Sequence, residues 1–160
     1  MGMAMEGIEP LAAWLEACLA CPIEPIPVPI PAIDALIGLG PGLTPSGDDF
    51  LGGVLVALHR LGASDVAGYL AERVLSRAER RTNEISYAHL AAAAEGEGLA
   101  PLHAVLSCLC APGAPRLVQT ISGVDAIGHT SGWDALAGVG FAAALMARVR
   151  VVHGAMRASV

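Results

Sequence analysis

The stretch GLGPGLTPSGDDFLGG, residues 38–53, concentrates six glycines, two prolines and two adjacent aspartates immediately before a run of apolar residues. Glycine and proline favour turns, whereas Ser and Asp are typical of the first turn of a helix, where they accept hydrogen bonds from free backbone N–H groups. The apolar run ends at Gly62, and glycine is a common helix terminator. The stretch therefore predicts a glycine-rich loop that leads into a helix over residues 48–61.

A second copy of this pattern lies 85 residues further along the chain. Residues 43–58 (LTPSGDDFLGGVLVAL) and 128–143 (GHTSGWDALAGVGFAA) match at seven of sixteen positions without gaps. Ser46 and Ser131 each precede an aspartate by three residues, which is close to the reciprocal hydrogen bonding of a capping box. We therefore predict an internal repeat in which both serines cap a helix.

Small residues follow each predicted cap. They are Gly52 and Gly53 in the first copy, and Ala137, Gly138 and Gly140 in the second. Because such residues let a neighbouring backbone approach closely, we expect the two helices to cross near their N-termini. The crossing would bring two sets of free backbone N–H groups into one cleft, an arrangement that attracts anions such as phosphate or carboxylate.

The aspartates of the repeat place negative charge near the predicted anion site, and this charge would repel an anionic ligand. They could turn inward as caps, bind a cation such as Mg²⁺ that the anion then shares, or accept a hydrogen bond or proton from an amide or amine. Asp48 is our preferred chemical residue because Trp133 stands at its position in the second copy, whereas Asp49 and Asp134 recur in both and are predicted to be structural. A role of both loops in capping and packing alone stays open.

His129 differs from the other histidines because it comes just before a predicted helix start, where the helix dipole favours a neutral ring that can donate or accept. We predict that it acts with Asp48. Thr82 and Ser86 follow an arginine-rich helix and could present their hydroxyls to the same cleft.

The composition is 54% apolar but only 4% aromatic, so the core is expected to consist of closely packed helices with small side chains. We predict one all-α domain over residues 1–160, with an N-terminal helical segment (1–21), a proline-rich strap (22–31) and a core (32–150). The domain is expected to be a compact bundle of about seven or eight short helices. Their expected ranges are 8–20, 31–38, 48–61, 64–81, 84–95, 101–110, 115–122 and 132–150.

Several classes of function are disfavoured by charge and composition. The net charge of −6 argues against a nucleic-acid partner, and the absence of lysine rules out Schiff-base chemistry and a Walker lysine. The uncharged run Ala135–Ala147 is thirteen residues, shorter than a bilayer requires, and the N-terminus has no basic flank ahead of an apolar signal core, so we predict a cytoplasmic protein without membrane segments. The pairs Cys18/Cys21 and Cys108/Cys110 are only a weak metal-site pattern, so we assign no metal ligands.

Three arginines, Arg73, Arg77 and Arg80, share one face of the fourth expected helix. This face is expected either to be solvated and paired with Glu72 and Glu79, or to bind an anion or a partner.

Three motifs together resemble a known bacterial family. The glycine-rich loop of residues 38–53, TNEIS of 82–86 and IGHTSGWDALAG of 127–138 are similar to AllH-type subunits of oxamate carbamoyltransferase, a family long known only as a domain of unknown function. The resemblance covers roughly residues 32–148. It implies a subunit of a complex that interconverts carbamoyl-oxamate plus phosphate with oxamate plus carbamoyl phosphate, and it implies other carbamoyltransferase subunits as partners.

Family members are commonly longer, with the glycine-rich motif deep in the chain, so we expect a short version that lacks the N-terminal half. The predicted substrate is a small anion, carbamoyl phosphate, oxamate or phosphate, bound at the paired helix N-termini. Beyond Asp48 and His129, the predicted ligand-binding residues are Gly40, Gly42, Thr44, Ser46, Gly47, Asp49, Thr82, Ser86, Thr130, Ser131, Gly132 and Asp134. No cofactor is assigned, although the aspartates are compatible with a bound Mg²⁺.

A non-catalytic function is the alternative. A chain this small and this apolar is expected to leave apolar surface exposed, which favours a ligand-sensing or scaffolding domain that docks a partner. The same surface predicts a homo-oligomer.

Overall fold

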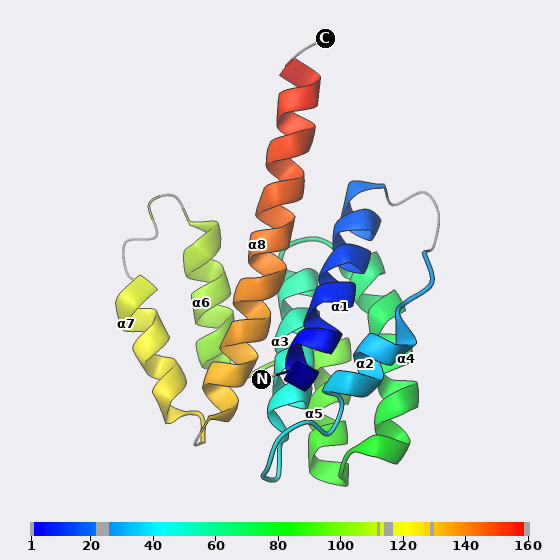
Figure 1. Cartoon of the computed structure of the whole chain (residues 1–160). Helices are drawn as coiled ribbons and strands as arrows, with labels where there is room; N and C mark the ends of the chain where they lie inside the picture. Colours follow the sequence, from blue (N-terminus) through cyan, green and yellow to red (C-terminus); the bar gives the residue numbers. More distant parts are fainter. Residues whose placement is uncertain (1, 22–25, 112, 114–116, 129, 159–160) are drawn as a thin grey trace.

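The protein is an all-α bundle, as the sequence predicts (Figure 1). The computed structural model describes residues 2–21, 26–111, 113, 117–128 and 130–158. Within these ranges it contains eight α-helices, one 3₁₀ helix and no strand. The elements are α1 (Gly2–Ala20), α2 (Ile30–Leu36), α3 (Ser46–Arg60), α4 (Ser64–Arg81), α5 (Glu84–Ala94), α6 (Ala100–Cys110), α7 (Leu117–Ser122), the 3₁₀ helix η1 (Gly123–Ala126) and α8 (Ser131–Ala158).

The helix α3 forms the centre of the bundle. Ten of its fifteen residues are buried, including Leu51, Val54 and Leu55, which are fully inaccessible. It packs along α8 and also contacts α4 and α5, so it is covered on several sides (Figure 1). A helix surrounded in this way is apolar on all faces, which explains why its sequence reads as a nearly continuous apolar run.

The two copies of the repeat cross through their glycines, which confirms the predicted close approach of the two helices. A Cβ atom at Gly53 would overlap the carbonyl group of Ala135, and one at Gly138 would overlap that of Phe50. The repeat offset makes Phe50 equivalent to Ala135, and Gly53 equivalent to Gly138. The two contacts are therefore reciprocal, and the N-terminal parts of α3 and α8 are related by a local two-fold axis.

The predicted cap at Ser46 is wrong. Residue Pro45 occupies the N-cap position, α3 begins at Ser46 itself, and no side chain makes a capping hydrogen bond there. The backbone caps the helix instead, because Gly47 N donates to Leu39 O at 2.9 Å. The loop folds back over the helix start, so a side-chain cap is not needed.

The N-terminal segment is more helical than predicted, since α1 begins at Gly2 rather than at residue 8. Its Gly7 faces α2, and a Cβ there would lie 2.8 Å from Ala32 O. In the predicted strap, residues 22–25 lie outside the described ranges, 26–29 are irregular, and α2 begins at Ile30.

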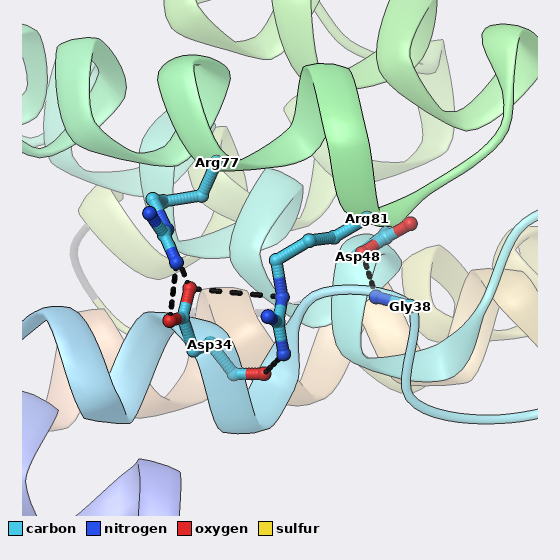
Figure 2. A network of polar contacts seen from close by, with 5 residues as sticks. All are labelled: Asp34, Gly38, Asp48, Arg77 and Arg81. Carbon is cyan, nitrogen blue, oxygen red and sulfur yellow. Dashed lines mark hydrogen bonds and ion pairs between the residues drawn. The ribbon is translucent and has the colours of Figure 1, made fainter.

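The arginine face of α4 joins this helix to α2 (Figure 2). The Arg77 guanidinium makes two hydrogen bonds of 2.6 Å to the Asp34 carboxylate. Arg81 donates to the backbone oxygen of Asp34 at 2.9 Å and forms a longer ion pair with its carboxylate. Arg73 pairs with Glu72 at 3.6 Å, as one alternative predicts. The face is thus partly an inter-helix link that the sequence analysis did not foresee.

One part of α8, Ser131–Val152, is long and apolar enough to cross a membrane by length and composition. The core helix of a soluble protein passes the same test, and 33% of this segment is buried against the rest of the bundle. The segment is therefore weak evidence for a membrane span.

Candidate functional site

A pocket of about 100 Å³ lies beside the crossing of α3 and α8. Its walls come from α3, α5, α6 and α8 together with the segments between them. Most of the lining is apolar or glycine, including Gly52, Gly53, Val56, Leu90, Ala93, Leu99, Leu102 and Ala135. The polar lining residues are Thr44, Asp48, Asp49, Ser86, His89, Glu97 and Ser131.

Asp48 is a buried carboxylate with several donors around it. Its Oδ1 accepts a hydrogen bond of 2.8 Å from Gly38 N (Figure 2), and its Oδ2 accepts bonds from the hydroxyls of Thr82 and Ser86. The side chain is only 2% exposed. These bonds tie the start of the glycine-rich loop to the junction of α4 and α5, so Asp48 holds together the segments that carry two of the three sequence motifs.

Asp49 and Asp134 occupy equivalent positions in the two copies and lie close enough for their charges to interact. The Oδ2 atom of each is buried and has no hydrogen-bond partner. Burial raises the pKa of the Asp49 carboxyl, and the like charge of Asp134 raises it further. Hydrogen bonds from Ser131 and Thr44, and the nearby His89, oppose this rise in pKa.

The glycine-rich loop is anchored to both neighbouring helix starts. The hydroxyls of Thr44 and Ser131 are 2.6 Å apart and form a hydrogen bond between the loop and α8. On the other side, Asn83 caps α5 with its side-chain oxygen and donates from its Nδ2 to Leu43 O at 2.8 Å. The loop is therefore held on both sides where Thr44 lines the pocket.

The helix N-termini beside the pocket have few free amides. In α3, Asp48 N and Asp49 N both donate to Pro45 O. In α8, Ser131 N donates to Gly128 O, and Asp134 N to Thr130 O. These amides are occupied by backbone carbonyls, and the nearby side chains are carboxylates, so the described residues offer less to an anion than the sequence predicts.

The predicted site residues divide into three groups. Thr44, Asp48, Asp49, Ser86 and Ser131 line the pocket. Two others do not line the pocket but interact with residues that do: the Thr82 hydroxyl donates to Asp48, and the Asp134 carboxylate interacts electrostatically with Asp49. The remaining described residues do not line the pocket and belong to the loops and helix starts; they are Gly40, Gly42, Ser46, Gly47, Thr130 and Gly132. His129 lies outside the described residues.

Gly47 and Gly132 are needed for packing. They hold equivalent positions in the repeat, and a Cβ at either would overlap a backbone oxygen of the short helix that precedes it, Leu36 O for Gly47 and Val124 O for Gly132. Each copy of the repeat thus consists of a short helix, a loop and a long helix that begins directly beneath the short one.

Two polar pocket residues, His89 and Glu97, were not predicted. A signal for His89 exists in the sequence, because Ser86, His89, Leu90 and Ala93 follow the i, i+3, i+4, i+7 spacing of one helix face. Glu97 lies in the segment between α5 and α6, where helical periodicity gives no guidance.

Metal-binding clusters are not evident in the described ranges, which hold no group of three or more His, Cys, Asp or Glu side chains arranged for an ion. The four cysteines are free thiols, with Cys18 buried and Cys21 and Cys110 exposed. The possible Mg²⁺ therefore stays a prediction.

The chain matches the model of a known protein family. The family model described as "Oxamate carbamoyltransferase subunit AllH" matches residues 36–143, more than half of the chain. The matched range includes the glycine-rich loop, both copies of the crossing and every residue that lines the pocket. No solved structure matches the chain.

Proposed function

The chain belongs to the family of the oxamate carbamoyltransferase subunit AllH, and from that premise we propose that its pocket holds the amide end of the substrate. The observation that carries the proposal is the buried, unpartnered Oδ2 atom of Asp49, which lines the pocket, together with the equivalent unpartnered atom of Asp134, whose charge interacts with Asp49. A buried acceptor without a donor is costly, and a ligand that brings N–H groups removes that cost.

The chemistry of the substrates fits such acceptors. Oxamate and the carbamoyl group each carry an –NH₂ that donates two hydrogen bonds. The hydroxyls of Thr44 and Ser131 lie beside Asp49, and they can donate to or accept from an amide. The carboxylate of oxamate is then placed nearest to His89, which lines the pocket and interacts electrostatically with Asp49.

Asp49 is suited to take the proton that carbamoyl transfer releases. The oxamate nitrogen forms a bond to the carbamoyl carbon, the bond from that carbon to the phosphate oxygen breaks, and phosphate leaves with the electron pair. The nitrogen loses one proton, which passes to the Asp49 carboxylate. Because burial raises the pKa of this carboxyl, it is a better proton acceptor than an exposed aspartate.

Asp48, predicted from the sequence to be the chemical residue, acts in this proposal as a positioning residue. Its hydrogen bonds to Gly38, Thr82 and Ser86 use both carboxylate oxygens. It fixes the loop that bears Thr44 and the first turn of α3 that bears Asp49.

The proposal is tested by comparing oxamate with oxalate, which replaces the –NH₂ by a charged oxygen. Thermal unfolding is followed while each ligand is titrated into the wild-type protein. A ligand that binds the folded state stabilises it by about 2.7 kcal/mol at a hundredfold excess over Kd. We expect a saturable rise in Tm with oxamate and none with oxalate, because Asp49 attracts an amide donor and repels a second carboxylate.

The variant Asp49→Asn is expected to weaken oxamate binding and to narrow the preference over oxalate. Asp65→Asn is the matched control, since Asp65 is an exposed aspartate in the first turn of α4, away from the pocket. Equal binding of oxalate, or binding of phosphate that survives Asp49→Asn, contradicts the amide proposal and supports the anion site predicted from the helix N-termini. Repeating the titrations with Mg²⁺ tests the predicted cation.

A further inference from the structure

Three exposed apolar side chains lie on the glycine-rich loop and on the two helix starts to which hydrogen bonds join it. Leu43 at the tip of the loop is 70% exposed, Ile85 at the start of α5 is 48% exposed, and Trp133 at the start of α8 is 45% exposed. We call these three residues the apolar rim. Large apolar side chains that gather beside a pocket are typical of a protein interaction site.

Two hydrogen bonds fix the members of the rim relative to one another. Asn83, two residues before Ile85, donates to the backbone oxygen of Leu43. Thr44, the neighbour of Leu43, bonds Ser131, two residues before Trp133. In Figure 1 the loop and the start of α5 lie at the lower end of the bundle, whereas the C-terminal part of α8 projects from the upper end.

The charges beside the rim are negative. Glu84 precedes Ile85 and is exposed, and the exposed Asp125 accepts a hydrogen bond of 2.8 Å from Trp133 Nε1. The chain has no lysine, and no arginine is among the described residues that line the pocket. Arg77 and Arg81 are engaged with Asp34 on α2. Carbamoyl phosphate has a phosphate end that needs cationic groups, and the described lining does not supply them.

We propose that the apolar rim docks another subunit of the carbamoyltransferase, one whose surface combines apolar side chains with lysine or arginine. The apolar side chains cover Leu43, Ile85 and Trp133, and the cationic side chains face Glu84 and Asp125. The partner closes the mouth of the pocket and brings the cations that bind the phosphate end. The catalytic site is therefore complete only at the interface, an inference that rests on the proposed function.

The first test measures affinity for the other purified subunits of the enzyme by titration calorimetry. Leu43→Glu and Trp133→Glu are each expected to weaken binding by at least about tenfold, because a charge placed in the centre of an apolar contact is costly. Val151→Glu is the matched control: Val151 is 72% exposed and lies on the projecting part of α8. All three variants replace exposed residues, and their melting temperatures are compared with that of the wild type to confirm folding.

The second test uses the absence of lysine. A carbodiimide joins a carboxylate to a lysine amine, so cross-links from an internal carboxylate of this chain to any lysine identify another protein. We expect cross-links from Glu84 or Asp125 to lysines of the partner subunit, identified by mass spectrometry. Their loss in Trp133→Glu, with the control Val151→Glu unaffected, supports docking at the rim.

The proposal is overturned by any of three results. These are wild-type affinity of the rim variants, equal loss of affinity in Val151→Glu, or light scattering that shows a homodimer which Leu43→Glu splits without changing partner binding. A failure of the proposed function is distinguishable: docking at the rim would persist while Asp49→Asn left oxamate binding and turnover of the assembled enzyme unchanged.

Discussion

At the scale of single residues, the carboxylate of Asp49 lies in an environment that disfavours its charged form. Asp49 is partly buried, its Oδ2 has no hydrogen-bond partner, and it interacts with the like charge of Asp134. The hydroxyls of Thr44 and Ser131 compensate only in part, since the net effect is a raised pKa. Residues that reduce stability in this way are often retained for function.

Replacing Asp49 by Asn is expected to raise the free energy of unfolding at neutral pH. The raised pKa means that the folded state binds the proton more tightly than the unfolded state, whose Asp pKa is about 4. The wild type therefore loses stability as the pH rises through the folded pKa, and the variant does not. Urea denaturation between pH 4 and 8 should show an advantage of Asp49→Asn that grows with pH. An advantage that is constant with pH would contradict the argument.

Substitution of Asp48, in contrast, is expected to lower the free energy of unfolding. Substitution by Ala removes the acceptor for the donors on Gly38, Thr82 and Ser86, and should cost about 2–4 kcal/mol because buried donors are left unpaired. Asp48→Asn keeps one acceptor and a group that the hydroxyls can bond, so its cost should be smaller. Chemical denaturation gives both values, and a loss below about 1 kcal/mol for Asp48→Ala would exclude the positioning role.

At the scale of helices, the sequence predicts most of the structure. Apolar periodicity, prolines and glycines predict the observed bounds of α4 and place most other helix ends within a few residues of the observed ends. The exceptions are α1, which starts six residues before its predicted start, and α8, which ends eight residues after its predicted end. The side-chain cap of α3 was not predicted correctly, because the carbonyl that satisfies Gly47 N belongs to Leu39 in a folded-back loop. Local patterns identify turn-forming residues but not which distant backbone group reaches them.

The crossing of α3 and α8 gives a prediction with an internal control. Gly138→Ala places a methyl group against the backbone of Phe50 and should destabilise by about 1–3 kcal/mol or more. Gly140 lies two residues further on the same helix, and a methyl group there would have no neighbouring atom within 4 Å, so Gly140→Ala should stabilise by about 0.5–1 kcal/mol. Thermal or urea unfolding separates the two variants. Similar effects of both would argue against the close backbone contact.

The link between α2 and α4 is expected to depend on pH in the acidic range. The hydrogen bonds from Arg77 lower the pKa of Asp34, so the folded state binds this proton less tightly than the unfolded state. The stabilisation is then present above the unfolded pKa of about 4 and is lost as the pH falls through the folded value. Asp34→Asn should reduce stability at pH 7 and make little difference near pH 2. A deficit that persists unchanged at low pH would show that the ion pair is not its cause.

At the scale of the whole molecule, the sequence predicts the repeat and the crossing of its two helices, but not which other helices complete the walls of the pocket. The repeat and the close crossing are readable from glycine and aspartate spacing. The wall formed by α5 and α6, with His89 and Glu97, depends on how helices distant in the sequence pack together, and no local pattern specifies it. The hydrogen bonds of Asp48 could not be predicted in full for the same reason, since its donors come from the start of the glycine-rich loop and from the junction of α4 and α5.

Hydrogen exchange should follow the distribution of burial through the bundle. The backbone amides of α3 are expected to exchange most slowly, because most of this helix is buried and it contacts several neighbours. The short α7, none of whose six described residues is buried, should exchange first. Mass spectrometry after peptic digestion gives the rates for both segments. Comparable protection of α7 and α3 would mean that the bundle opens only as a whole.

The local two-fold axis between α3 and α8 governs how a ligand can be oriented. If the two halves were identical, an unsymmetrical molecule would bind equally well in either of two opposite orientations. Here the halves have diverged, with Asp48 in one copy and Trp133 at the same position in the other. The shared glycines and aspartates keep the two halves in the same arrangement, and differences such as this one give the cleft a direction, so that a molecule with two different ends has one preferred way to enter.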